Sequence, residues 1–194
     1  MNGSPWHELI ARGYDWEYVN FQLRYCRAYS QLASSGAILY NGVSFDWLVV
    51  VDDDSAVWPA NVRRFLSQFD PTKAYFIGWA FDDWPMVSGA GALISAAAMK
   101  KLVPHLNNCS LLVAREGYPQ DKATGAQMLM AGVPATPEHR IYMTHIRHYE
   151  ESERSTFPLI AHHLKGKDLL EVYMNYTAFY GRVENTVWPI KLHD

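Results

Sequence analysis

The sequence has little of three features that mark particular classes of protein. Its 194 residues include only two cysteines, Cys26 and Cys109, which excludes a disulfide scaffold and leaves a single bridge open. The net charge of -3 arises from mixed signs with no basic block, so the chain lacks the charge pattern of a nucleic-acid partner. The longest charge-free apolar stretch, residues 84–99, is interrupted by small residues and is too short to span a bilayer. With no signal segment at its start, we expect a soluble globular chain.

An acidic run directly follows an apolar one. Leu48 to Val51 is uninterrupted and rich in β-branched residues, which is typical of a fully buried strand in a parallel sheet. Asp52, Asp53 and Asp54 then stand at the strand's carboxyl end, where open α/β sheets bind ligands. Neighbouring carboxylates repel one another unless a cation compensates, and their oxygens suit Mg²⁺ or Mn²⁺ bound together with substrate phosphates. Taken alone, a solvated acidic turn explains the run equally well.

Periodic apolar patterns predict one α/β domain over residues 1–194, without repeats or linkers. Helices are expected over residues 15–33, 59–69, 96–106, 121–131 and 167–179. Strands are expected over residues 45–51, 74–79, 141–145 and 157–160. The glycine-containing segment 87–95 is expected to be a loop between the second strand and the third helix.

Three other features have both an ordinary and a functional explanation. The glycines in residues 88–91 either form a tight turn or let the backbone approach a ligand. Asp121 stands at a helix start, where the helix dipole favours its ionised form, and capping alone would account for it. His162 and His163 follow the last expected strand, and singly each would be an ordinary surface or core histidine.

In their order along the chain, these signals closely resemble the inverting β1,3-glycosyltransferases, the family that includes fringe and core-1 galactosyltransferase. The shared order is a strand ending in Asp-Asp-Asp, a Tyr-Phe-Ile-Gly strand, Gly-Ala-Gly before Leu-Ile-Ser, a Pro-x-Asp helix start with Thr-Gly, and a late His. The resemblance covers residues 46–181, with residues 1–45 as a helical lead-in and 182–194 as a tail. It implies a GT-A fold, a Rossmann-like nucleotide-sugar-binding domain with a mixed, mostly parallel central sheet and flanking helices.

The same resemblance implies a metal site. The three aspartates look like the family's DxD motif, which binds a Mn²⁺ ion (with Mg²⁺ as the alternative) that bridges the UDP diphosphate. Asp54 is the first choice for a direct ligand, while Asp52 and Asp53 contact the metal or the ribose and sugar of the donor. His162 resembles the family's late metal-ligating histidine, and His163 is the second choice for that role.

The resemblance further implies a donor-sugar contact and a catalytic base. The position of the family's Gly-Gly-Ala-Gly is taken here by Ser88, Gly89, Ala90 and Gly91. Asp121 matches the general base of fringe-like enzymes, although the preceding position, often acidic in the family, is Gln120. A base on the face opposite the leaving group would take the proton of the acceptor hydroxyl, as inversion requires.

The implied function is metal-dependent inverting transfer of a hexose or N-acetylhexosamine from a UDP-sugar to a glycan or glycoprotein hydroxyl, forming a β1,3 linkage. Family members are usually type II membrane proteins of the Golgi, with an anchor and a further strand–helix–strand portion upstream. We therefore expect an N-terminally truncated domain that meets a membrane only through an anchor outside this chain. The alternatives are a non-catalytic relative, acting as a chaperone or glycan-binding module, and a Mg²⁺-dependent phosphohydrolase. The phosphohydrolase would require a phosphate-cradling loop or a nucleophilic aspartate pattern, neither of which the sequence shows.

Overall fold

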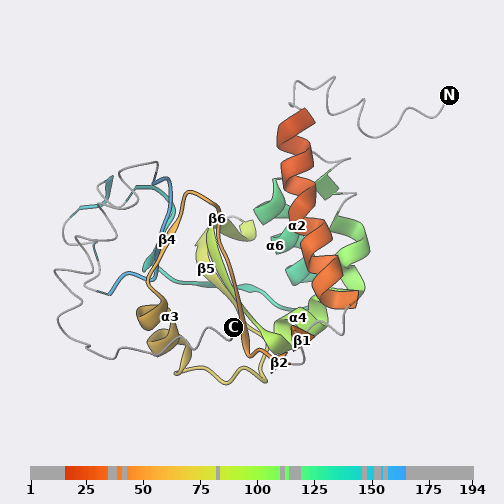
Figure 1. The fold of residues 1–194 in the computed structure, drawn as a ribbon, viewed down its shortest axis with the longest axis horizontal. Coiled ribbons are helices and arrows are strands. Elements are labelled where there is room, and N and C mark those ends of the chain that lie inside the picture. Colours follow the sequence, from red (N-terminus) through yellow and green to blue (C-terminus); the bar gives the residue numbers. More distant parts are fainter. Residues whose placement is uncertain are drawn as a thin grey trace, which may run out of the picture.

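The computed structural model describes residues 16–34, 39–40, 43–81, 84–109, 112–113, 119–145, 148–150, 154 and 157–164. These residues form an α/β fold in which helices lie against mixed sheets (Figure 1). The α/β class that the sequence predicts is therefore confirmed. The helix predicted over residues 167–179 lies outside the described residues.

The four other predicted helices are present. They are α2 (Trp16–Ser34), α3 (Pro59–Leu66), α4 (Ala96–Leu102), which the 3₁₀ helix η1 (Val103–Asn108) continues, and α6 (Gln120–Met130). Local signals fix their ends. Ser95 caps α4 by accepting a hydrogen bond from the Ala98 N–H at 3.1 Å, and Gly132 ends α6 with a left-handed φ of 70°.

The larger sheet has the strand order β3-β6-β5-β7. Its members are β3 (Trp47–Val50), β5 (Phe76–Phe81), β6 (Trp84–Ser95) and β7 (Ala135–Pro137). The β3–β6 and β5–β6 pairs are antiparallel, and only the β5–β7 pair is parallel. The sheet is mixed as predicted, but the expected mostly parallel arrangement is wrong for these strands. Only a short connection separates β5 from β6, whereas a parallel crossover requires about a dozen residues or more.

The segment 87–95, predicted as a glycine loop, belongs instead to the strand β6 at the centre of this sheet. Its small residues allow close packing. A Cβ on Gly91 would lie 2.6 Å from Cδ1 of Ile160. On the neighbouring strand, a Cβ on Gly78 would overlap Val87 Cγ1 and lie 2.6 Å from the Gly91 carbonyl oxygen. Gly78 therefore permits close approach to the neighbouring strand, and Gly91 permits close approach of Ile160 from outside this sheet, so these glycines do not form a turn.

The strand before the aspartates also differs from its prediction. β3 is antiparallel and, among the described strands, pairs with β6 alone. It is not fully buried, because the side chain of Val49 is 37% exposed. The sequence could not distinguish an edge strand from a central one because both carry the same β-branched run.

A second, three-stranded sheet has the order β4-β9-β8. It consists of β4 (Ala56–Val57), β8 (Ile141–Tyr142) and β9 (Ile160–Ala161), with β4–β9 antiparallel and β8–β9 parallel. β8 and β9 are shorter than the strands predicted there. A separate hairpin joins β1 (Leu39–Tyr40) to β2 (Val43–Ser44).

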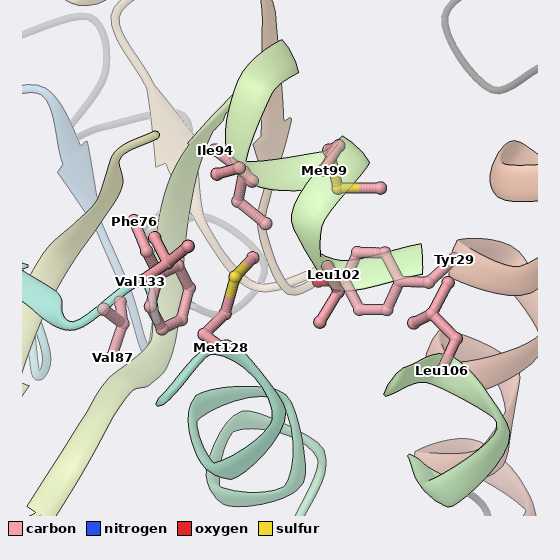
Figure 2. Packing of buried hydrophobic residues seen from close by; sticks show 10 residues of the cluster. Tyr29, Phe76, Val87, Ile94, Met99, Leu102, Leu106, Met128 and Val133 are labelled. Atoms are coloured by element: carbon pink, nitrogen blue, oxygen red, sulfur yellow. The ribbon is translucent and has the colours of Figure 1, made fainter. Parts of the chain in front are cut away.

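The two faces of the larger sheet are covered by different helices. Successive residues of β5 point to opposite faces, so Phe76 packs toward α2, α4 and α6, while Ile77 packs toward α3. Figure 1 shows these two helical layers on either side of β5 and β6. Figure 2 shows the first layer, where Phe76 and Ile94 of the sheet meet Met99, Leu102 and Met128 of the helices.

A disulfide joins α2 to the segment that follows η1. Cys26 on α2 bonds to Cys109, 83 residues later, and both are buried. They lie in a small apolar cluster with Leu23, Val113 and Ala123. None of the helices within the described ranges is both long and apolar enough to cross a membrane.

Candidate functional site

The antiparallel β4–β9 pair places the acidic run opposite the two late histidines. Ala56 lies opposite Ala161, so the residues before β4 run alongside those after β9. The Leu164 N–H donates to the carbonyl oxygen of Asp54 at 2.9 Å, which continues this alignment beyond the strands. Residues far apart in the sequence are therefore held together by backbone hydrogen bonds, independently of any charge attraction.

The ring of His162 lies against two of the three aspartates. Its Nε2 atom is 3.0 Å from Asp54 Oδ1 and 3.4 Å from Asp52 Oδ2. On the other side of the ring, Nδ1 lies 3.0 Å from the carbonyl oxygen of Met143. A carbonyl oxygen can only accept, so this hydrogen bond requires the proton on Nδ1. In the neutral ring, Nε2 then presents its lone pair to the carboxylates.

The charges around this ring favour a cation. Burial lowers the pKa of His162. The raising effects of Asp52, the Met143 carbonyl and Asp54 are together larger, so the pKa lies above its ordinary value. Burial raises the pKa of Asp52, yet donation from the protonated His162 ring and from the Tyr25 hydroxyl brings it below its ordinary value. Both directions have the same physical cause, because the carboxylates and the ring stabilise opposite charges on each other.

Asp54 provides the test of fit for a metal. Its Oδ1 atom is buried and, among the described residues, has no hydrogen-bond partner, although the His162 nitrogen is only 3.0 Å away. Asp54, His162 and His163 offer ligand atoms that all lie within 4.8 Å of one another. One carboxylate oxygen and imidazole nitrogens are donors that Mn²⁺ accepts, and a backbone hydrogen bond to the far ring nitrogen is typical of metal-bound histidine. These residues therefore fit a divalent ion.

The other residues predicted to contact the metal or the donor differ in how close they lie to Asp54 and His162. His163, predicted as the second choice, joins it, with its ring centroid 4.1 Å from that of His162 and its backbone at a φ of 58°. Asp52 stands beside the group and faces His162 from 3.4 Å. Asp53 is exposed to solvent.

The carboxylates of Asp52 and Asp121 both lie beside Gly89. The Gly89 N–H donates to Asp121 Oδ2 at 3.1 Å. A Cβ on Gly89 would lie 3.0 Å from Asp52 Oδ2 and 3.9 Å from Asp121 Oδ2. The two carboxylates therefore converge on one glycine, and a small cavity between α2, β6 and α6 is lined by Tyr29, Asp52, Gly89, Gln120, Asp121 and Thr124, among others.

The other residues of this glycine motif take different places. Ala90 is buried, and its carbonyl oxygen accepts a hydrogen bond from the Ser55 hydroxyl at 3.5 Å. Gly91 packs against Ile160 and lines the same small cavity as Gly89. Ser88 lies in β6, and its side chain is outside the description.

Asp121 lies in the first turn of α6, as the sequence predicts. Its Oδ1 atom accepts a hydrogen bond from the Lys122 N–H at 2.8 Å, so each carboxylate oxygen has one backbone donor. Burial raises the pKa of Asp121, the two N–H donors lower it, and the charge of Asp52 raises it, with a net value above the ordinary range. Asp121 is thus an oriented carboxylate with raised proton affinity, as a general base requires.

One residue of this arrangement is not predicted from the sequence. The hydroxyl of Tyr25, on α2, donates a hydrogen bond to Asp52 Oδ1. Only its spacing of one helical turn from Tyr29, which is buried and lines the cavity, could have indicated that this side of α2 faces the site.

Comparison with known families identifies a match to a family of known proteins. The sequence model of the Fringe-like family matches residues 19–157, well over half of the chain. The matched range begins within α2 and includes Tyr25, the three aspartates, Gly89 and Asp121. It ends shortly before His162.

Proposed function

Because this chain belongs to the Fringe-like family, a glycosyltransferase family, we propose that it is a metal-dependent inverting glycosyltransferase that uses a UDP-sugar. The observation that carries the metal dependence is the buried Asp54 Oδ1, which faces the His162 ring nitrogen without a hydrogen bond. Together with the family, this favours an enzyme over a non-catalytic relative, which would have no use for such a pair.

In the proposed site, Asp54 and His162 hold Mn²⁺ or Mg²⁺, with His163 and Asp52 beside them. The bound ion would neutralise negative charge that develops on the UDP diphosphate as the sugar departs. The chain's own contribution is orientation. The Met143 carbonyl fixes the His162 ring, and the Leu164 N–H fixes the backbone of Asp54.

Asp121 is the proposed general base. Its carboxylate is oriented by the N–H groups of Gly89 and Lys122, and its raised pKa favours accepting the proton of the acceptor hydroxyl. Gly89 has no side chain, so an acceptor or donor sugar could approach between Asp121 and Asp52.

The finer assignments follow the family resemblance. We propose that the donor sugar is a hexose or N-acetylhexosamine, that a β1,3 linkage is formed on a glycan or glycoprotein hydroxyl, and that the protein acts in the Golgi lumen. The further proposed contacts to the UDP-sugar are made by Asp53, Ser88, Ala90 and Gly91. We propose that residues 1–194 form one catalytic domain.

Calorimetric titration of UDP, first with Mn²⁺ and then with EDTA, tests the proposal. We expect binding that requires Mn²⁺ and is lost in Asp54→Ala. Asp46→Ala is the matched control, because Asp46 is an exposed aspartate at the opposite end of β3 and should leave binding unchanged. A screen of UDP-sugars would follow. Absence of binding by the folded wild-type chain would overturn the proposal.

A further inference from the structure

We propose that Tyr25 is a positioning residue of the donor site, whose hydroxyl sets the orientation of the Asp52 carboxylate toward His162 and Gly89. This inference rests on the proposed function, because it concerns how that site binds a metal ion and UDP. Nothing in the sequence pattern of the three aspartates indicates a partner on α2.

The two oxygens of Asp52 have different neighbours. Oδ1 accepts the hydrogen bond from the Tyr25 hydroxyl. Oδ2 lies 3.4 Å from His162 Nε2 and 3.0 Å from the position that a Cβ on Gly89 would occupy. A carboxylate is planar, so fixing one oxygen also fixes the direction of the other. The Tyr25 hydroxyl therefore sets the direction in which the second oxygen points, toward His162 and Gly89.

Tyr25 can do this because α2 is firmly anchored on both sides of it. The next residue, Cys26, forms the disulfide with Cys109, and Leu23 and Tyr29 are each only 3% exposed. The tyrosine ring has only two side-chain torsions, so little conformational freedom remains to be lost in the hydrogen bond. The hydroxyl is thus held in place before any ligand binds.

The chemistry of the contact also suits positioning. A hydrogen bond from a neutral hydroxyl to a carboxylate is charge-assisted and stronger than one between neutral groups. Burial and the charge of Asp52 raise the pKa of Tyr25 above its ordinary value, so the phenol keeps its proton. Tyr25 therefore remains a donor to Asp52.

The test compares Tyr25→Phe with the wild type in Mn²⁺ titrations followed by electron paramagnetic resonance, in the presence of UDP. Loss of an outer hydrogen bond of this kind typically weakens metal binding by about 10- to 100-fold, and we expect about tenfold here. Tyr75→Phe removes a hydroxyl from a tyrosine that stacks on Trp47 and should leave the affinity unchanged. Thermal unfolding without metal should show little change for either variant.

A double-mutant cycle separates positioning from a general structural role. Asp52→Ala removes the acceptor of the same hydrogen bond, so adding Tyr25→Phe to it should cause no further loss of Mn²⁺ affinity. An equal loss in both backgrounds would overturn the inference, as would unchanged affinity in Tyr25→Phe. If the folded wild type itself fails to bind Mn²⁺ and UDP, the proposed function falls, and the inference falls with it.

Discussion

Replacing Gly89 by alanine would place a methyl group between the two carboxylates that define the site. The new Cβ would lie 3.0 Å from Asp52 Oδ2 and 3.9 Å from Asp121 Oδ2. The second distance is an ordinary contact, but the first requires Asp52 to move by a few tenths of an ångström. Gly89 lies within β6, whose extended backbone an alanine can adopt without strain.

The expected loss of activity depends on how easily the Asp52 side chain can move. Its side chain is 24% exposed, so it can rotate away while the sheet remains intact. The oxygen that moves is the one that faces His162, so the cost falls on the site and not on folding. A misplacement of about 1 Å costs on the order of 100-fold in rate, so a few tenths of an ångström should cost roughly 3- to 10-fold.

The assay is Mn²⁺-dependent UDP binding and sugar transfer, measured beside thermal unfolding. Gly78→Ala is the contrasting variant, because its methyl would overlap Val87 Cγ1 and lie 2.6 Å from the Gly91 carbonyl oxygen, which cannot move aside. We expect it to destabilise the fold by about 1–3 kcal/mol. The reasoning is refuted if Gly89→Ala leaves binding and transfer unchanged, or if it destabilises the protein as much as Gly78→Ala does.

Further predictions concern Asp121, the disulfide and the ion pair of Glu138 with Arg140. Asp121→Asn should keep UDP binding but reduce transfer by at least about 100-fold, as a comparison of calorimetry with product formation would show, and surviving transfer would place the base elsewhere. Since burial raises the pKa of Asp121, activity should decline on acidification at a pH above the ordinary aspartate range. Reducing the Cys26–Cys109 disulfide frees a loop of 83 residues and should lower the free energy of unfolding by about 2–5 kcal/mol, measured by urea unfolding with and without reductant. Burial raises the pKa of Glu138, but hydrogen bonds from Arg140 lower it to a net value below the ordinary one. Its ion pair therefore stabilises the fold above the ordinary glutamate pKa and loses this effect as the pH falls through the lowered value. Glu138→Gln should cost roughly 1 kcal/mol near neutral pH, and a cost that persists in acid would contradict this.

The helices could be predicted from the sequence because their signals are local. Pro59 opens α3, the Ser95 hydroxyl caps α4, and Gly132 ends α6, each at or near the predicted position. Such signals depend only on residues within one or two turns, so a single sequence contains them in full.

The sheet was predicted less well because strand pairing depends on residues far away in the sequence. A run such as Leu48–Val51 shows that a strand is present but not whether it is central or parallel. The small residues of β6 resembled a loop because the neighbours that require close packing lie on other strands. Ile160, in β9, lies against Gly91, and Val87 of β6 lies against Gly78 of β5.

The site was predictable as far as motif order could indicate it. The sequence singled out the aspartates, Gly89, Asp121 and His162, and the structure brings Asp52 and Asp54 to His162 and Asp121 to Gly89. Tyr25 was missed because nothing in a helical pattern shows which polar group its hydroxyl meets. The roles of these residues remain predictions.

The pairing of β4 with β9 also bears on how the protein is synthesised. Asp54 enters the growing chain long before His162, and at about 5–20 residues per second the delay is roughly 5–20 seconds. Throughout that interval the acidic run has no histidine beside it, and the β4 backbone lacks the strand with which it pairs. The site is therefore among the last features to form, and a chain released before residue 162 would carry the aspartates without the histidine that faces them. An ion that binds only the finished site would stabilise complete molecules selectively over incomplete ones.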